Sequence, residues 1–502
     1  SFHSLYDNDF DGFLYSINPD FKMPSETEFR NRIKEFSDSI INKIYTFIKG
    51  KKVSLLIDGV KRKHRKYQAQ MLFTPYQLFF IGIEECKDET SQSIANMISK
   101  TAIKISNNGG KLVSVCTDNF SSNISSLNWG PNSAQQLSGQ FFLRFPCSCH
   151  TLNLCVKDLF DNKYKNIKET VILLIDYFNR MSNEYSSIND VPQFTEIRWY
   201  SLFYCIDYII AHNEYLNNFS LEIYNAIQNK YDWNYIHLIL KTIEILMKKF
   251  ESDLASLADI FFNIKSTVNQ LRIINNMYKK TKDINIATEM IDSILHRFTT
   301  TSNLYLPILA FFLTGKGINY LNESSSEKEI AAQVAQDTFK VYSQFHPFKK
   351  ELCHLFKIFL ENPNSTFLIL QNSTHDSFIF WNNIINGGNF WQNEPQFISR
   401  HKEFNMITKI FAQFAIEILS IPCSETACER VFSQLEDLLM NNKRNLCSDM
   451  LNTLLIIRMN SLFLKQYGKN THDFINDDLL KLFKEDIKEE DLNFRSDPLI
   501  YF

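Results

Sequence analysis

Two short, almost wholly apolar runs, each ending in an aspartate, constrain the fold of this chain more than any other feature. They occupy residues 53–58 and 112–118 and end at Asp58 and Asp118. Such runs are typical of strands that are buried on both faces of a sheet. A right-handed helical crossover can place two such strands side by side and parallel. We therefore expect Asp58 and Asp118 to lie at the same edge of one sheet.

The segments around these runs predict an α/β mixed sheet interrupted by a large all-α insertion domain. The periodicity of apolar residues predicts a helix over 25–50, a strand hairpin over 67–73 and 78–83, a helix over 94–105, a strand over 141–145, and mainly helices from about 155 to 415. The expected organisation is an irregular segment 1–24, a first part of the sheet-containing core 25–155, a helical insertion 156–402, a second part of the core 403–466 and an acidic tail 467–502.

Composition excludes several classes of protein. Lys and Arg number 53 against 56 Asp and Glu, so the formal charge of -3 excludes a histone-like polycation, and any nucleic-acid surface must be local. The ten cysteines are scattered along a long chain, which argues against a disulfide scaffold. No stretch approaches the roughly 20 apolar residues that span a bilayer. Because the chain starts at Ser1 without a signal-peptide pattern, we expect a soluble protein that lacks its natural N-terminus.

A third carboxylate would turn the two aspartates into a candidate metal site. Alone, the two aspartates are better explained as turn residues or helix caps than as a site. Divalent-metal phosphoryl transfer needs several hard oxygen ligands around two ions about 4 Å apart. The segment 421–433 predicts a helix that starts at Pro422 and Ser424 and carries three glutamates on one face, namely Glu425, Glu429 and Glu436. Spacing does not say which of them points at the aspartates, and a solvated helix face is the alternative.

Five motifs together resemble the hAT superfamily of DNA transposases. They are Ile57-Asp58-Gly59, Thr117-Asp118-Asn119 with Asn123, residues 147–154 with their Cys-x-x-His spacing, Arg198-Trp199, and Leu419 to Pro422 followed by Glu429-Arg430-Val431-Phe432-Ser433. The resemblance covers residues 27–463. It implies an RNase H-like catalytic core, a helical insertion, a C-terminal dimerisation region and a DDE-type site. The catalytic and metal-binding acids would then be Asp58, Asp118 and Glu429, with Mg²⁺ or Mn²⁺ as the cofactor.

The same resemblance assigns roles to other residues. His150 would support catalysis, for instance by a hydrogen bond to the scissile phosphate. Trp199, beside Arg198, would stack on a base turned out of the duplex, although a buried tryptophan at a helix start explains it as well. Cys147 and His150 also have zinc-ligand spacing, but no second pair is nearby in the sequence. The family commonly has a tryptophan two residues after the first aspartate, where this chain has Val60.

Basic residues complete the expected DNA contacts. Positive charge is densest just after Val60, where a phosphate-binding cluster and a solvated hairpin are equally compatible with the pattern. The candidate DNA-binding cations are Lys61, Arg62, Lys63 and Arg65, together with Arg198 and Arg444.

These features predict a nuclear cut-and-paste DNA transposase that binds transposon ends and target DNA. It would form at least a dimer through its C-terminal region. One alternative is a domesticated, non-catalytic hAT-derived protein that binds DNA or acts as a regulator. A stand-alone RNase H-type nuclease is another, which the helical insertion disfavours. Family members often begin with a BED-type zinc finger, and we expect that such a module is missing from this fragment.

Overall fold

The computed structural model describes most of the chain between residues 25 and 463. The described residues are 25–62, 65–86, 88, 90–128, 130–182, 190–195, 200–218, 232–278, 285–300, 304–321, 326–344, 346–361, 374–386, 401–441, 447–461 and 463. The chain divides into two compact units, one of residues 42–452 and one of residues 1–41 with 453–502. The expected irregular segment 1–24 and acidic tail 467–502 lie outside the described residues.

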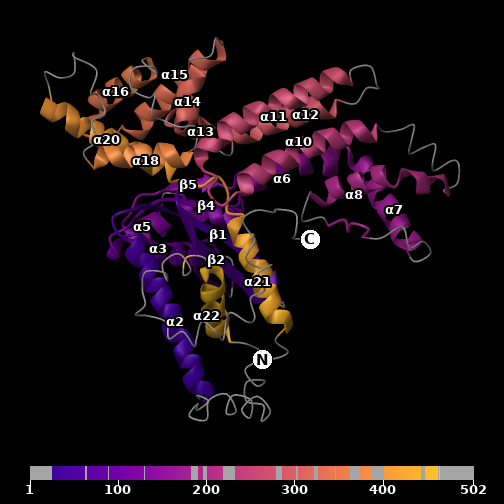
Figure 1. Cartoon of the computed structure of the whole chain (residues 1–502), viewed down its shortest axis with the longest axis horizontal. Helices are drawn as coiled ribbons and strands as arrows, with labels where there is room; N and C mark the ends of the chain where they lie inside the picture. The colour runs from indigo at the N-terminus through magenta and orange to yellow at the C-terminus, as the bar shows by residue number, and fades with distance from the viewer. Residues whose placement is uncertain are drawn as a thin grey trace, which may run out of the picture. The chain divides into compact units, whose positions relative to one another are not determined.

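A five-stranded mixed sheet organises the larger unit (Figure 1). Its strands are β1 (Lys52–Arg62), β2 (Arg65–Thr74), β3 (Gln77–Cys86), β4 (Lys111–Thr117) and β5 (Leu143–Pro146), in the spatial order β3-β2-β1-β4-β5. β2 and β3 form the predicted antiparallel hairpin, whereas β1 pairs with β4 in parallel. The prediction that the two aspartate-bearing strands are parallel neighbours is therefore confirmed.

The prediction that the first of these strands ends at Asp58 is wrong. The parallel pairing of β1 with β4 stops at Leu56, which lies opposite Cys116. The antiparallel pairing of β1 with β2 continues to Arg62, opposite Arg65. Because β1 still pairs with β2 after its pairing with β4 has stopped, Asp58 lies inside a long strand. Only β4 ends beside it.

The two faces of the sheet have different covers, which follow from the alternation of side chains along β1. On one face, Thr101 of helix α3 (Ser91–Asn107) donates to Gln70 on β2 at 2.6 Å. On the other face, Ser54 on β1 donates to the carbonyl of Ser420 at 2.7 Å. The part of the chain around Ser420, here called the C-terminal segment, therefore covers the face that carries Ser54.

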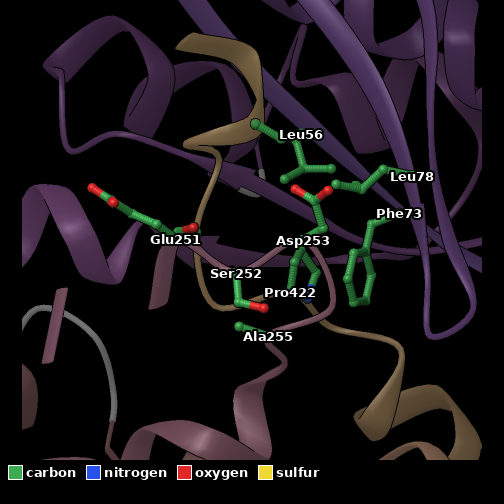
Figure 2. A pocket seen from close by; sticks show the side chains of 10 residues that line it. Leu56, Phe73, Leu78, Glu251, Ser252, Asp253, Ala255 and Pro422 are labelled. Atoms are coloured by element: carbon green, nitrogen blue, oxygen red, sulfur yellow. The ribbon is translucent and has the colours of Figure 1, made fainter. Parts of the chain in front are cut away.

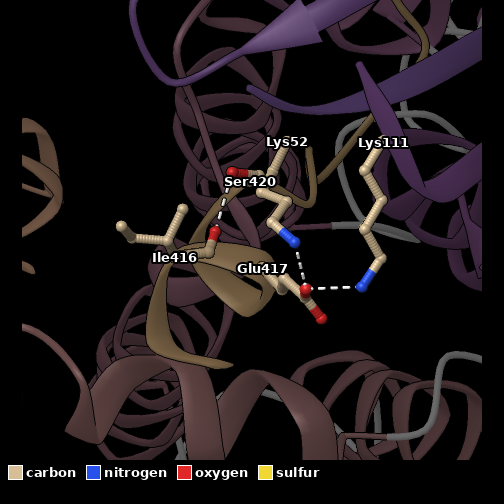
Figure 3. A network of polar contacts seen from close by, with 5 residues as sticks. All are labelled: Lys52, Lys111, Ile416, Glu417 and Ser420. Carbon is tan, nitrogen blue, oxygen red and sulfur yellow. Dashed lines mark hydrogen bonds and ion pairs between the residues drawn. The ribbon is translucent and has the colours of Figure 1, made fainter. Parts of the chain in front are cut away.

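An ion-pair network fastens this C-terminal segment to the start of the sheet (Figure 3). Glu417, near the end of α20 (His401–Leu419), accepts from Lys52 at 2.5 Å and from Lys111 at 2.6 Å. One turn later, the hydroxyl of Ser420 donates to the carbonyl of Ile416 at 2.7 Å. One carboxylate thus joins the first residues of β1 and β4 to α20.

Helices make up the rest of the larger unit. From Ser148 to Leu419 the described residues contain helices and no strand apart from one isolated bridge at Ser256, as predicted. These helices are α6 (Ser148–Lys157), the π-helix η2 (Asp158–Lys163), α7 (Lys165–Met181), α8 (Tyr200–Ala211), the 3-10 helix η3 (Asn213–Asn218), α10 (Trp233–Glu251), α11 (Leu257–Met277), α12 (Ile286–Thr300), α13 (Tyr305–Phe312), α14 (Gly315–Leu321), α15 (Ser326–Tyr342), α16 (Lys349–Glu361), α18 (Thr374–Ile385) and α20. Within the described ranges, every helix is too short or too polar to span a lipid bilayer.

The helical region shares its core with the sheet. α6 packs against α10 and α12, and the buried apolar residues run without a break from Cys116 on β4 through these helices to Cys423. The remaining helices are α2 (Glu26–Phe47), α4 (Ser121–Leu127), α5 (Ala134–Ser138), α21 (Ala427–Asn441) and α22 (Ser448–Met459). All ten cysteines are free thiols.

The smaller unit contains the first part of α2, which has the amphipathic pattern expected from the sequence. Two ion pairs, each four residues apart, line its exposed side: Glu26 with Arg30 and Glu28 with Arg32, both at 2.6 Å. Such pairs support the first turns of a helix.

Candidate functional site

Asp58 and Asp118 occupy matching positions on neighbouring parallel strands. Leu56 lies opposite Cys116, and each aspartate follows its strand's residue of this pair by two positions. Because side chains two residues apart point to the same face, both carboxylates face the side that the C-terminal segment covers. The structure therefore brings these two predicted site residues together.

The C-terminal segment runs along this face in step with the strands. Ser420 lies beside Ser54, and five residues later the carboxylate of Glu425 accepts a contact from the thiol of Cys116 at 3.9 Å. Four residues further, the charge of Glu429 is close enough to raise the pKa of Asp58. The C-terminal segment thus brings Glu425 beside Cys116 and Glu429 close to Asp58, which lies two residues further along the strands.

The glutamates do not share one helix face, so this prediction is wrong. Helix α21 begins at Ala427 rather than at Pro422. The preceding residues make tertiary contacts instead: Pro422 forms an isolated bridge with Ser256, and the hydroxyl of Ser424 donates to the carbonyl of Phe250 at 2.8 Å. Since these contacts hold the backbone out of helical geometry, Glu425 lies in the turn before α21 and Glu429 in the first turn of the helix.

Asp118 is fixed in orientation by its own loop. Its Oδ1 accepts from the backbone N–H of Phe120 at 2.9 Å and from the amide of Asn123 at 2.6 Å. The carbonyl oxygen of the Asn123 side chain is buried and has no hydrogen-bond partner in the described part of the chain. Orphaned buried acceptors are rare, and one beside a carboxylate is suited to a cation or a water molecule.

The carboxylate of Asp58 is unfavourable in its charged form. Burial is the largest cause, and the carboxylates of Glu429 and Asp118 add repulsion, which together raise the pKa of Asp58 to about 8. The backbone N–H of Gly59 donates to its Oδ1 at 2.7 Å and opposes this shift. Perturbation of this kind by burial and like charge is frequent at functional sites.

Glu425 is more deeply buried still, at 6% exposure. Burial raises its pKa well above the ordinary range, and the charges of Asp58 and Asp118 push it in the same direction. A hydrogen bond with Cys147 opposes the shift. Four carboxylates, those of Asp58, Asp118, Glu425 and Glu429, therefore lie near the end of β4, with Asp58 within electrostatic range of the other three.

The donor set fits a hard divalent cation. Among the described residues, no three His, Cys, Asp or Glu side chains are grouped closely enough to hold a metal ion as they stand. Carboxylates are nevertheless the ligands that Mg²⁺ and Mn²⁺ prefer, and the Oδ2 atoms of Asp58 and Asp118 accept no hydrogen bond from any described residue. Like charges keep such groups apart, whereas a cation between them would reverse the interaction.

His150 lies in the first half of α6 beside this group. Its backbone N–H donates to the sulfur of Cys147, the residue that caps the helix, at 3.3 Å. Burial lowers the pKa of the His150 imidazole, and the nearby carboxylate of Asp118 works against that shift. His150 is therefore placed within electrostatic range of the second aspartate.

The basic residues are only partly available to phosphates. Arg62 pairs with Glu436 at 3.4 Å, and Arg65 pairs with Glu85 at 3.5 Å. Lys61 is exposed near the end of β1. The remaining candidate DNA-binding residues, which are Lys63, Arg198, Trp199 and Arg444, lie outside the described residues.

Two arginines near the site escaped the sequence-based prediction. Arg144 on β5 donates to the backbone carbonyl of Asp118 at 3.2 Å and to the side chain of Asn119 at 2.9 Å. Arg430, which follows Glu429, forms an ion pair with Asp253 in the loop after α10. Arg144 could have been noticed in the sequence, because it is the one charged residue in the apolar run 141–145. No local pattern in the sequence links Arg430 to Asp253.

A small pocket lies on the same face of the sheet as the aspartates (Figure 2). Leu56 and Phe73 line it from the strands, Pro422 from the C-terminal segment, and Asp253 from the loop after α10. Its walls therefore come from the same three parts of the chain that position the carboxylates.

A mixed sheet with carboxylates beside the point where two strands stop pairing in parallel defines a candidate metal-binding protein of the α/β class. In the C-terminal part, residues 380–461 match the hAT family C-terminal dimerisation region. The matched residues include α20, α21 and both glutamates. A comparison with curated proteins finds no match.

Proposed function

We propose that this protein is a cut-and-paste DNA transposase with an RNase H-like catalytic core, in which Asp58, Asp118 and Glu429 form a DDE site. The observation that carries the proposal is the position of the two aspartates at matching levels of parallel strands, with Glu429 in electrostatic range of Asp58. The hAT dimerisation region at 380–461 supports it from the other end of the chain.

Each residue of the site has a role that follows from its surroundings. Asp58, Asp118 and Glu429 would hold Mg²⁺ or Mn²⁺, and Asn123 keeps the carboxylate of Asp118 in one orientation. When bound, the metal ions would supply Lewis-acid activation of an attacking water or 3' hydroxyl and stabilise the leaving oxygen. The mainly neutral imidazole of His150 is suited to a hydrogen bond with the scissile phosphate.

DNA binding and self-association complete the proposal. Lys61, Lys63, Arg198 and Arg444 would contact phosphates, and Trp199 would stack on an unpaired base. Arg62 and Arg65 would exchange their carboxylate partners for phosphates when DNA binds. The protein would act in the nucleus on transposon ends and target DNA, as a dimer or larger homo-oligomer.

A cleavage assay tests the proposal. The purified full chain is incubated with Mg²⁺ or Mn²⁺ and with DNA duplexes that carry the sequences flanking its coding region, where the ends of a transposon lie. We expect strand breaks at those ends, reduced by about 100-fold or more in Asp118→Asn, because loss of a metal ligand removes several kcal/mol of transition-state stabilisation.

The control is Glu169→Gln in α7, since this exposed glutamate pairs with Lys165 of the same helix. Cleavage that is unchanged in a folded Asp118→Asn variant would refute the DDE assignment. DNA binding without any cleavage by the unaltered chain would favour the alternative, a domesticated hAT-derived DNA-binding protein.

A further inference from the structure

Glu425 is a buried acid that has no role in the proposed site of Asp58, Asp118 and Glu429. Its side chain is 6% exposed, in the turn before α21. Its carboxylate is contacted by thiols, namely Cys116 at 3.9 Å and Cys147. Thiols are weak hydrogen-bond donors, so this carboxylate is poorly compensated for the water that it has lost.

No cation offsets the charge of Glu425 within the described residues. The ion pairs nearest to it along the chain use other acids, Glu417 with two lysines and Glu436 with Arg62. The charged groups whose effect on Glu425 is resolved are the carboxylates of Asp58 and Asp118, which both repel it. A buried charge without a partner costs several kcal/mol, so an uncompensated glutamate at this position needs a reason.

The level of Glu425 on the sheet supplies a reason. Its carboxylate touches Cys116, which precedes Asp118 by two residues on the same face of β4. Two residues along a strand correspond to about 6.6 Å, so Glu425 lies one level below the aspartate pair. Two metal ions of a phosphoryl-transfer site are about 4 Å apart, and their ligands must reach them from more than one level.

A second observation points to a ligand at the same place. Asn123 is 8% exposed, its amide nitrogen donates to Asp118, and its side-chain oxygen has no partner among the described residues. The orphaned oxygen of Asn123 and the carboxylate of Glu425 are both electron donors close to Asp118. A cation would satisfy the two at once.

We propose that Glu425 is a fourth carboxylate of the metal site, which binds the divalent cations from the buried side while Glu429 approaches from the exposed side. This inference rests on the proposed function, because it assigns another residue to the same site.

The test measures metal binding and thermal unfolding of the full chain, without DNA. Mn²⁺ binding is followed by electron paramagnetic resonance, and Tm is recorded in EDTA and in Mg²⁺. In Glu425→Gln, which keeps the shape and removes the charge, we expect an equal or higher Tm in EDTA. We also expect a smaller Mg²⁺-induced rise in Tm, and Mn²⁺ affinity at least about 10-fold lower.

A second variant and a matched control keep the test decisive. Glu425→Asp retains the charge but draws the carboxylate back by one methylene, so its Mn²⁺ affinity should fall even if Glu425→Gln proves to be unfolded. Glu436→Gln, eleven residues later in α21 and outside the site, should bind Mn²⁺ like the unaltered protein. Unchanged Mn²⁺ affinity in folded Glu425→Gln or Glu425→Asp overturns the inference.

The failure of this inference differs from that of the proposed function. If Asp118→Asn loses Mn²⁺ binding while both Glu425 variants keep it, only the role of Glu425 is refuted. If the unaltered chain binds no Mn²⁺, or if Asp118→Asn binds it normally, the DDE site and the role of Glu425 both fall.

Discussion

Single carboxylates in this protein carry effects that should be visible in the pH dependence of stability. In the metal-free fold, Asp58 has its pKa raised to about 8 by burial and by the carboxylates of Glu429 and Asp118, with Glu425 also in range. The folded state therefore holds a proton that the unfolded chain releases near pH 4. The resulting stability is complete below about pH 4 and is lost as the pH rises through about 8.

The variant Asp58→Asn should remove this component. In EDTA, its Tm advantage over the unaltered protein should widen from pH 5 to pH 8 and level off above pH 8, because Asn does not titrate. The underlying slope is at most about 1.4 kcal/mol per pH unit for one proton. A Tm difference that stays constant from pH 5 to pH 9 would contradict the raised pKa.

The neighbouring positions of Asp58 and Asp118 were predictable. Two short apolar runs joined through a crossover helix can form only a few sheet topologies. The burial of Glu425 was not predictable. It depends on Pro422 and Ser424 bonding to the helical region instead of starting a helix, and those partners are far away in the sequence. Local patterns favoured a helix at this point, and tertiary contacts overrode them.

At the scale of elements, the backbones of two consecutive helices in the helical region approach each other closely at a glycine. A Cβ atom on Gly317 in α14 would come within 2.1 Å of the carbonyl oxygen of Phe311 in α13. We expect Gly317→Ala to lower the free energy of unfolding by about 2 kcal/mol or more, since neither backbone can move without breaking its helix.

Thermal unfolding of Gly317→Ala and of a control variant, Gly130→Ala, checks this expectation. Gly130→Ala is the matched control, because nothing lies within 4 Å of its Cβ position. It should change the free energy of unfolding by less than about 0.5 kcal/mol. Equal Tm values for Gly317→Ala and Gly130→Ala would show that α13 and α14 do not approach so closely.

Most elements of the sheet were predictable, but their ends were not. The hairpin of β2 and β3 follows from a turn between two apolar runs, and the structure confirms it. The extension of β1 to Arg62 arises from pairing with β2 over residues that are polar and basic. Backbone hydrogen bonds between strands do not need apolar side chains. The end of the strand predicted from the apolar pattern therefore lies too early in the sequence.

For the whole molecule, the hAT dimerisation region at 380–461 suggests self-association. We expect light scattering after size exclusion to give at least twice the chain mass of 59.0 kDa at micromolar concentration. The same result should hold for Asp118→Asn, because Asp118 lies outside the association region 380–461. A mass of one chain at every concentration would contradict the expectation.

The order of the elements along the chain has a consequence for biosynthesis. Cys116 and Glu425 touch although 309 residues separate them, and Ser54 and Ser420 touch across 366. A ribosome therefore completes the first four strands long before it makes the segment that covers their acidic face. If the proposed chemistry is correct, nascent chains and products of premature termination cannot cut DNA, and nuclease activity arises only in molecules that can also pair.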